Sequence, residues 1–328
     1  MTGDTIINGT DIYTAYGAFI SLGGYNGVVG WPASKPVEYN DWMEYDGIEV
    51  DLSALKLDSR EFEISFGIQR PAQDTLAFYD FLCSEPTMTC SFNTLGLTDK
   101  TYRVVGMSDV DYALTFGEIR VLFADDSPMD GYEYVAPSVS RSLPTSPLLL
   151  GGTPVSEYGV RILYGTIRGA FVKGQVKPFL LRNIRTSSGS MYDANPKLWN
   201  GEDWEISETK GVPKYKAIEI NIKCSLAAPT VTEFWQNYNA FLWDLTAPDT
   251  SKELLRRCER ELSFEDMMWP CYYNRQEIDD FSIWNDGVTI CFSLSMIAMA
   301  GGPVEYTRLL ATEGGSLIIT EDGKHIKV

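Results

Sequence analysis

The chain contains one sequence pattern twice. Residues 16–20 read Tyr-Gly-Ala-Phe-Ile and residues 158–162 read Tyr-Gly-Val-Arg-Ile, and the match runs without a gap to Lys-Pro at 35–36 and 177–178. After a change in length, Phe-Glu-Ile-Ser-Phe at 62–66 is answered by Ile-Glu-Ile-Asn-Ile at 218–222. A repeat of about 140 residues exceeds any solenoid or propeller unit. We therefore expect two related domains, each with its own core.

Each copy contains a strand with one buried face, because apolar and polar residues alternate there with a period of two. The apolar positions of the first strand are Phe62, Ile64, Phe66 and Ile68. Those of the second are Ile218, Ile220, Ile222 and Cys224. Later alternating runs at 118–123 and 288–296 predict the strand that closes each copy.

A proline after each strand leads into a predicted helix. The first is expected over 74–83, capped by Asp74, and the second over 230–243, where Thr230 and Glu233 match a capping box. The expected buried stripes are Leu76, Tyr79 and Leu82 in the first helix and Phe234, Tyr238, Phe241 and Leu242 in the second. Packing against a sheet is the commoner use of such aromatics, and contact with a cofactor is the alternative.

These patterns predict a mainly β fold of two tandem duplicated β-sandwich or barrel domains, each with a flanking helix. We expect copy one at 1–135, a Pro/Ser linker pinned by leucines at 136–154, and copy two at 155–303. Copy two carries a longer loop at 186–215, with Trp199 and Trp204, and an extra helix at 251–262. Residues 304–328 predict a β-meander arm, too small to be stable alone, that docks by sheet augmentation.

Bulk composition excludes several classes of protein. The net charge of −18 argues against specific nucleic-acid binding, although an acidic wall lets a polyanion slide past, and solubility is the plainer alternative. No apolar run is long enough to span a bilayer, and no secretory signal is visible, so we expect folding in a cytoplasm. The six cysteines lack a Cys-x-x-Cys pair and predict buried thiols.

Catalytic and cofactor motifs are missing from the sequence. The one histidine is His325, and neither phosphate-binding glycine pattern occurs. Glu49, Asp51, Asp109 and Asp111 are generic candidates for a carboxylate pair, and Asp109 with Asp111 lacks the rest of a calcium loop. We predict no catalytic, cofactor-binding or metal-binding residue, and no enzyme.

Three segments of the first copy form a recognisable set: Asn-Gly-Thr-Asp-Ile at 8–12 with Tyr-Gly at 16–17, Glu-Tyr-Asp-Gly-Ile-Glu-Val-Asp at 44–51, and Phe-Glu-Ile at 62–64. Together they resemble the opening domain of phage and prophage distal tail or baseplate proteins, members of the tail-tube superfamily. The arm at 309–328 is similar to the tails of phage structural proteins. The second copy departs from the distal-tail pattern and instead resembles hub proteins, in which three chains supply six tube-like domains.

The resemblance implies a tail-tube fold and a non-catalytic ring subunit, a trimer or hexamer, in the tail tip or baseplate of a virion assembled in the host cytoplasm. Its expected partners are copies of itself and other tail proteins, with DNA passing through the ring unbound and no membrane contact. The alternative is a carbohydrate-binding or adhesin-like β protein, in which Trp199 and Trp204 stack on sugars. A glycan-cleaving enzyme is the third class and rests only on the generic carboxylates.

Overall fold

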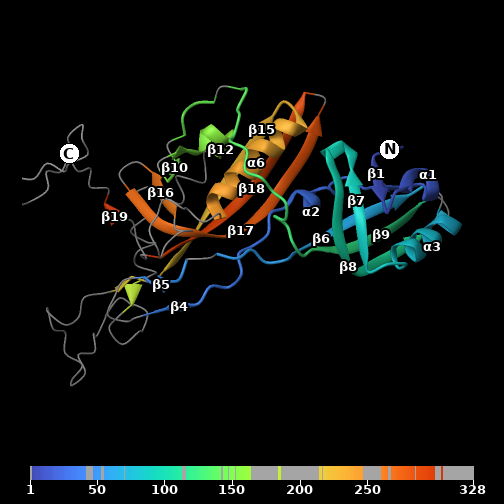
Figure 1. The fold of residues 1–328 in the computed structure, drawn as a ribbon, viewed down its shortest axis with the longest axis horizontal. Helices are drawn as coiled ribbons and strands as arrows, with labels where there is room; N and C mark the ends of the chain where they lie inside the picture. The colour runs from blue at the N-terminus through green and yellow to red at the C-terminus, as the bar shows by residue number, and fades with distance from the viewer. Residues whose placement is uncertain are drawn as a thin grey trace, which may run out of the picture.

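The computed structural model describes residues 2–41, 47–52, 55–69, 71–112, 116–141, 143–146, 148–151, 153–163, 184–185, 214–215, 217–246, 260–264, 267–284, 286–299 and 304–305. The predicted mainly β fold is confirmed: two antiparallel sheets lie side by side along the long axis of the view in Figure 1. A helix packs on the strands of each sheet.

The first sheet has seven strands in the order β2-β1-β7-β8-β9-β6-β3. Helix α1 (Ile12–Tyr16) joins the two edge strands, and five helical residues span only about 8 Å. The sheet is therefore curled so that its edges approach each other. Its elements are β1 (Thr5–Ile7), β2 (Thr10–Asp11), β3 (Ala18–Ile20), α2 (Asn26–Val29), β6 (Arg60–Ile68), α3 (Pro71–Leu82), β7 (Thr87–Phe92), η1 (Asn93–Leu95), β8 (Leu97–Tyr112) and β9 (Gly117–Asp125).

The second sheet repeats this order as β11-β10-β16-β17-β18-β15-β12, and β19 also pairs with β17. Each strand occupies the place of its counterpart, and a short helix again joins the two edge strands. The elements are β10 (Leu148–Leu150), β11 (Thr153–Pro154), η2 (Val155–Tyr158), β12 (Val160–Ile162), β15 (Ile218–Ala228), α6 (Val231–Thr246), β16 (Arg260–Phe264), β17 (Met267–Trp284), β18 (Gly287–Ala298) and β19 (Val304–Glu305).

A two-stranded hairpin precedes the long inner strand of each copy. In the first copy it pairs β4 (Tyr39–Asn40) with β5 (Glu49–Val50), and in the second it pairs β13 (Ile184–Arg185) with β14 (Lys214–Tyr215). The connection from β3 to β6 thus has a counterpart in the connection from β12 to β15.

The structure corrects the alignment of the two copies by two residues. Ile20 pairs with Phe66 in the first sheet, whereas Ile162 pairs with Cys224 in the second. Phe66 therefore corresponds to Cys224 and not, as the sequence match suggested, to Ile222. The buried face is preserved because a shift of two residues leaves every side chain of a strand on the same side. Seven of the strand positions predicted to be buried are buried: Phe62, Ile64, Phe66, Ile68, Ile220, Ile222 and Cys224.

The two long strands β8 and β17 carry bulges at matching places. Strand β6 pairs with β9 and strand β15 pairs with β18, so the corrected alignment also makes Phe123 of β9 the counterpart of Met296 of β18. Val104 faces Phe123, and the next paired residue of β8 is two positions on. Tyr273 faces Met296, and β17 skips one residue in the same way. The skipped residues, Val105 and Asn274, are therefore counterparts.

The first flanking helix differs from its prediction. It begins at Pro71, so Asp74 lies within its first turn and is not its cap. Proline is common at the first helical position, because a backbone N–H there would have no hydrogen-bond acceptor within the helix and its absence costs nothing. Leu76 is 53% exposed, and the buried face consists of Thr75, Phe78 and Leu82.

The second flanking helix follows its prediction more closely. The predicted cap is confirmed, since the hydroxyl of Thr230 accepts a 3.1 Å hydrogen bond from the backbone N–H of Glu233. The predicted stripe is buried. The carboxylate of Glu233 accepts hydrogen bonds from Ser140 of the linker, at 3.0 Å from its backbone N–H and also from its hydroxyl.

The linker lies along α6 and ends earlier than the sequence suggested. The buried side chain of Asn237 accepts from the N–H of Ser138 at 2.7 Å and donates to its carbonyl at 3.1 Å. An amide side chain thus bonds the linker as a neighbouring strand would. The leucines at 148–150 do not pin a linker to the surface: they form β10, paired with β16 inside the second sheet.

Part of the predicted extra helix is strand. Arg260, Glu261 and Leu262 belong to β16, which pairs with both β10 and β17, so long-range pairing overrides the local helical signal. Residues 251–259, residues 186–213 of the long loop, and the arm from 306 onwards, which includes His325, lie outside the described residues.

Candidate docking site at the junction of the two sheets

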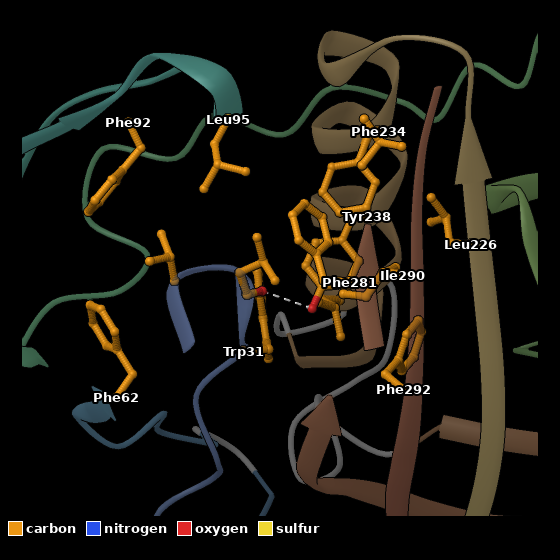
Figure 2. Packing of buried hydrophobic residues seen from close by; sticks show 14 of the residues in the cluster. Trp31, Phe62, Phe92, Leu95, Leu226, Phe234, Tyr238, Phe281, Ile290 and Phe292 are labelled. Atoms are coloured by element: carbon orange, nitrogen blue, oxygen red, sulfur yellow. Dashed lines mark hydrogen bonds between the residues drawn. The ribbon is translucent and has the colours of Figure 1, made fainter. Parts of the chain in front are cut away.

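The residues that follow β3 leave the first sheet and contact the second. Buried residues of both sheets form a single hydrophobic cluster, which includes Val29 and Trp31 from the first copy and Tyr238 and Phe281 from the second. Figure 2 shows Trp31 lying toward the aromatic side chains of α6. The junction is thus a continuous piece of core.

Arg60 of β6 holds this segment to the first sheet. Its guanidinium donates to the carbonyls of Gly27 at 2.9 Å, Val28 at 2.8 Å, and Gly30. It also lies 3.6 Å from the carboxylate of Asp125 and over the ring of Phe62. Burial lowers the pKa of Arg60, yet an arginine remains charged at every ordinary pH. Burial also raises the pKa of Asp125, and the nearby Arg60 opposes that shift.

Trp31 enters the second copy between α6 and β17. Its ring packs edge-to-face on Tyr238, with ring centres 6.3 Å apart. Its backbone N–H donates to the side-chain oxygen of Gln276 at 3.1 Å. The hydroxyl of Tyr238 lies 2.8 Å from the same oxygen and 3.1 Å from the carbonyl of Val29. Polar groups of the two copies therefore hydrogen-bond one another across the junction.

The next residues bind the edge of β17 at its first bulge. The hydroxyl of Tyr273 donates to the carbonyl of Pro32 at 2.8 Å. The carbonyl of Asn274, the bulge residue, accepts from the backbone N–H of Ser34 at 2.8 Å and from its hydroxyl at 3.1 Å. The first copy thus supplies backbone hydrogen bonding to an otherwise unpaired strand edge of the second.

The hairpin of the same connection makes a second contact. Leu52, Tyr272 and Met299 form a separate buried cluster, with Ile48 and Val50 packed against it. The N–H of Ile48 donates to the carbonyl of Met299 at 2.9 Å. The connection from β3 to β6 therefore docks on the second sheet at two places.

A cleft of about 610 Å³ lies beside the junction, between the first sheet and α6. Two ion pairs lie in its lining: Arg103 binds both carboxylate oxygens of Asp126, at 2.8 and 2.9 Å, and Arg60 faces Asp125. Asp99, Lys100, Asp130 and Glu133 also line the cleft. The side-chain hydrogen bond from Arg103 lowers the pKa of Asp126. Both ion pairs join side chains of the first copy on one wall of the cleft.

The generic carboxylates of the sequence do not gather into one site. Glu49 lies in β5 and Asp51 directly after it, beside the second sheet, whereas Asp109 and Asp111 lie in β8 of the first sheet. Within the described part of the chain, no group of three or more His, Cys, Asp or Glu side chains is placed to hold a metal ion. No described helix is both long enough and apolar enough to cross a membrane.

The cysteines follow their prediction in part. Cys90, Cys224 and Cys271 are buried, Cys291 is half-buried, and Cys83 at the end of α3 is exposed. Burial raises the pKa of the Cys90 thiol to about 12. Cys258 lies outside the described residues.

Sequence reasoning missed the junction residues because the second copy does not share them. In the gap-free match, Trp31 corresponds to Lys173 and Ser34 to Val176. A tryptophan present in one copy only was the available signal. Comparison with family models, curated proteins and solved structures gives no significant match to this chain.

Proposed function

We propose that the protein is a structural ring subunit of a phage or prophage tail tip or baseplate, of distal-tail or hub-like type. It surrounds the DNA channel, connects the tube to the baseplate and carries out no catalysis. The virion tail is its final location, and its partners are copies of itself and neighbouring tail proteins.

One observation carries this proposal. The chain holds two sheets of the same strand order, joined by a connection of the first that docks on an edge of the second. Such a contact is head-to-tail, because the docking surface and the accepting surface are different. Head-to-tail contacts between like units form a closed ring when the rotation from one unit to the next adds up to a full turn. A single chain therefore already supplies two neighbouring units of such a ring.

Charge supports the same proposal. Residues 1–135 hold 22 acidic and 7 basic side chains, a net charge of −15, whereas residues 136–328 hold 23 and 20, a net charge of −3. The two copies therefore offer electrostatically different faces to their neighbours. A strongly acidic ring also repels the phosphate backbone and lets DNA pass without binding.

Electron microscopy of the purified protein at high concentration tests the proposal. We expect rings built from three or six chains, and binding to tail fractions of a phage that carries this protein. A protein that stays monomeric at every concentration and does not join tails contradicts it. Binding of the monomer to a glycan array supports the carbohydrate-binding alternative.

A further inference from the structure

The docking site on the second sheet has a counterpart on the first. The bulge residues Val105 of β8 and Asn274 of β17 are counterparts. Their neighbours therefore correspond as well: Val104 to Tyr273, and Met107 to Gln276. In β17 these positions receive Trp31 to Ser34 from the first copy. The equivalent stretch of β8 is thus a matched acceptor.

This stretch of β8 has an open edge. Strand β7 pairs with β8 only as far as Arg103, and the N–H of Val104 bonds the carbonyl of Pro86. Beyond that point, none of the described strands pairs with this edge, although β9 continues along the other edge to Tyr112. The side chain of Val105 is 39% exposed. Unpaired strand edges of this kind are templates for another chain.

A groove of about 450 Å³ adjoins the open edge. It lies between the end of α3 and β8 and is lined by Tyr79, Leu82, Cys83, Glu85, Pro86, Val104, Gly106 and Met107. In the second copy the corresponding space, between α6 and β17, holds Trp31 and Pro32. Among the described residues, none occupies this groove, which is the equivalent of the space that Trp31 and Pro32 fill.

We propose that this groove and the adjacent edge of β8 bind another molecule of the same protein. The binding segment is the connection between β12 and β13 of that molecule. That connection is the counterpart of the one that carries Trp31 to Ser34, and it follows the same edge strand. The proposal deepens the proposed function, on which it rests, by naming the contact between neighbouring subunits. The first and second repeats of successive molecules then alternate around the ring.

Charge complementarity favours this occupant. Residues 163–183 contain Arg168, Lys173, Lys177 and Arg182 and no acidic residue, whereas residues 1–135 carry a net charge of −15. The groove itself includes Glu85. Because a lysine replaces the buried tryptophan of the intramolecular contact, the contact between subunits is more polar. We expect it to weaken as ionic strength rises.

Photo-crosslinking of the full chain tests the contact. A benzoylphenylalanine at position 105, irradiated at a concentration where rings form, should give covalent dimers and larger multimers. Mass spectrometry should locate the link in residues 163–183 of the neighbouring chain. The same probe at position 284, where Trp284 is exposed on the second sheet, should give no link to that segment.

A substitution provides the second readout. Val105→Glu should lower ring yield at least tenfold while leaving the melting temperature unchanged, because the side chain is exposed, and Val105→Thr should retain ring formation. Rings that form without a link from position 105 to residues 163–183, or undiminished rings of Val105→Glu, overturn this contact and leave the proposed function intact. If the unmodified protein forms no rings and joins no tails, the contact and the proposed function both fail.

Discussion

The hydroxyl of Tyr273 donates a 2.8 Å hydrogen bond to the carbonyl of Pro32, which lies 241 positions earlier in the chain. Both residues are buried. The two sheets therefore share polar contacts within one core, and loss of such a contact affects both. Tyr273→Phe should lower the free energy of unfolding by about 1–2 kcal/mol, because it leaves a buried carbonyl unpaired.

Urea denaturation measures this effect. Tyr13→Phe is the matched control, since the hydroxyl of Tyr13 bonds Gln69 at an exposed position and its loss should change stability by less than about 0.5 kcal/mol. Equal stability of Tyr273→Phe and the unmodified protein would show that the bond contributes nothing to the junction.

Removal of the Asn237 side chain should release the linker from α6. Asn237→Ala leaves both the N–H and the carbonyl of Ser138 without their partner, at a cost of roughly 2–3 kcal/mol. Trypsin should then cut after Arg141 several times faster than in the unmodified protein. Gln236→Ala, which loses one exposed bond to the carbonyl of Ala136, should accelerate cleavage far less. Unchanged cleavage of Asn237→Ala would mean that other contacts hold the linker.

A charge on the buried face of either inner strand should unfold that sheet. Ile64 and Ile222 are counterparts in the corrected alignment, and each is 0% exposed. Ile64→Asp and Ile222→Asp should each cost several kcal/mol, and Ile220→Asp should do the same. Circular dichroism melting curves measure the loss.

The outward-facing neighbours provide controls. Glu63→Ala and Asn221→Ala occupy equivalent exposed positions and should leave the melting temperature within a few degrees. If Ile222→Asp melted like the unmodified protein, the assigned face of β15 would be wrong.

Stability should fall as the pH rises above 9. Burial raises the pKa of Cys90 to about 12, from an ordinary value of 9.0 in the unfolded chain. Between these values the unfolded chain loses a proton that the folded protein keeps, so the free energy of unfolding decreases with pH, by up to about 1.4 kcal/mol per pH unit for each such group. Burial also raises the pKa of Cys224, which adds to the slope.

Urea titrations at pH 9, 10 and 11 test this dependence. Cys90→Ala should reduce the slope by up to about 1.4 kcal/mol per pH unit, whatever its cost at pH 7. A slope that Cys90→Ala does not alter would contradict the assignment of this group.

Removal of the terminal arm should affect assembly more than folding. Strand β19 pairs with β17 at Met267 and Met268, so a truncation after Glu305 retains that pairing. Deleting residues 306–328 should leave the melting temperature nearly unchanged and reduce ring formation, measured by light scattering. A collapse of monomer stability would assign the arm to the core of the second copy.

The sequence by itself determined the features that depend on short stretches of chain. Alternation along residues 62–68 and 218–224 predicted the buried strand faces, and Thr230 predicted the start of α6. These signals are local, because side-chain period and helix capping involve residues only a few positions apart. The repeat likewise indicated two related sheets, and their strand orders match.

Only the tertiary structure decided how these parts pair and meet. The two-residue shift between Phe66 and Cys224, the inclusion of Leu148 in a sheet, and the insertion of Trp31 beside Tyr238 all depend on partners far away in the chain. Strand register is invisible in a periodic pattern, since a shift by two residues preserves it. The junction, and with it the matched open site on β8, follows from long-range packing that no local pattern encodes.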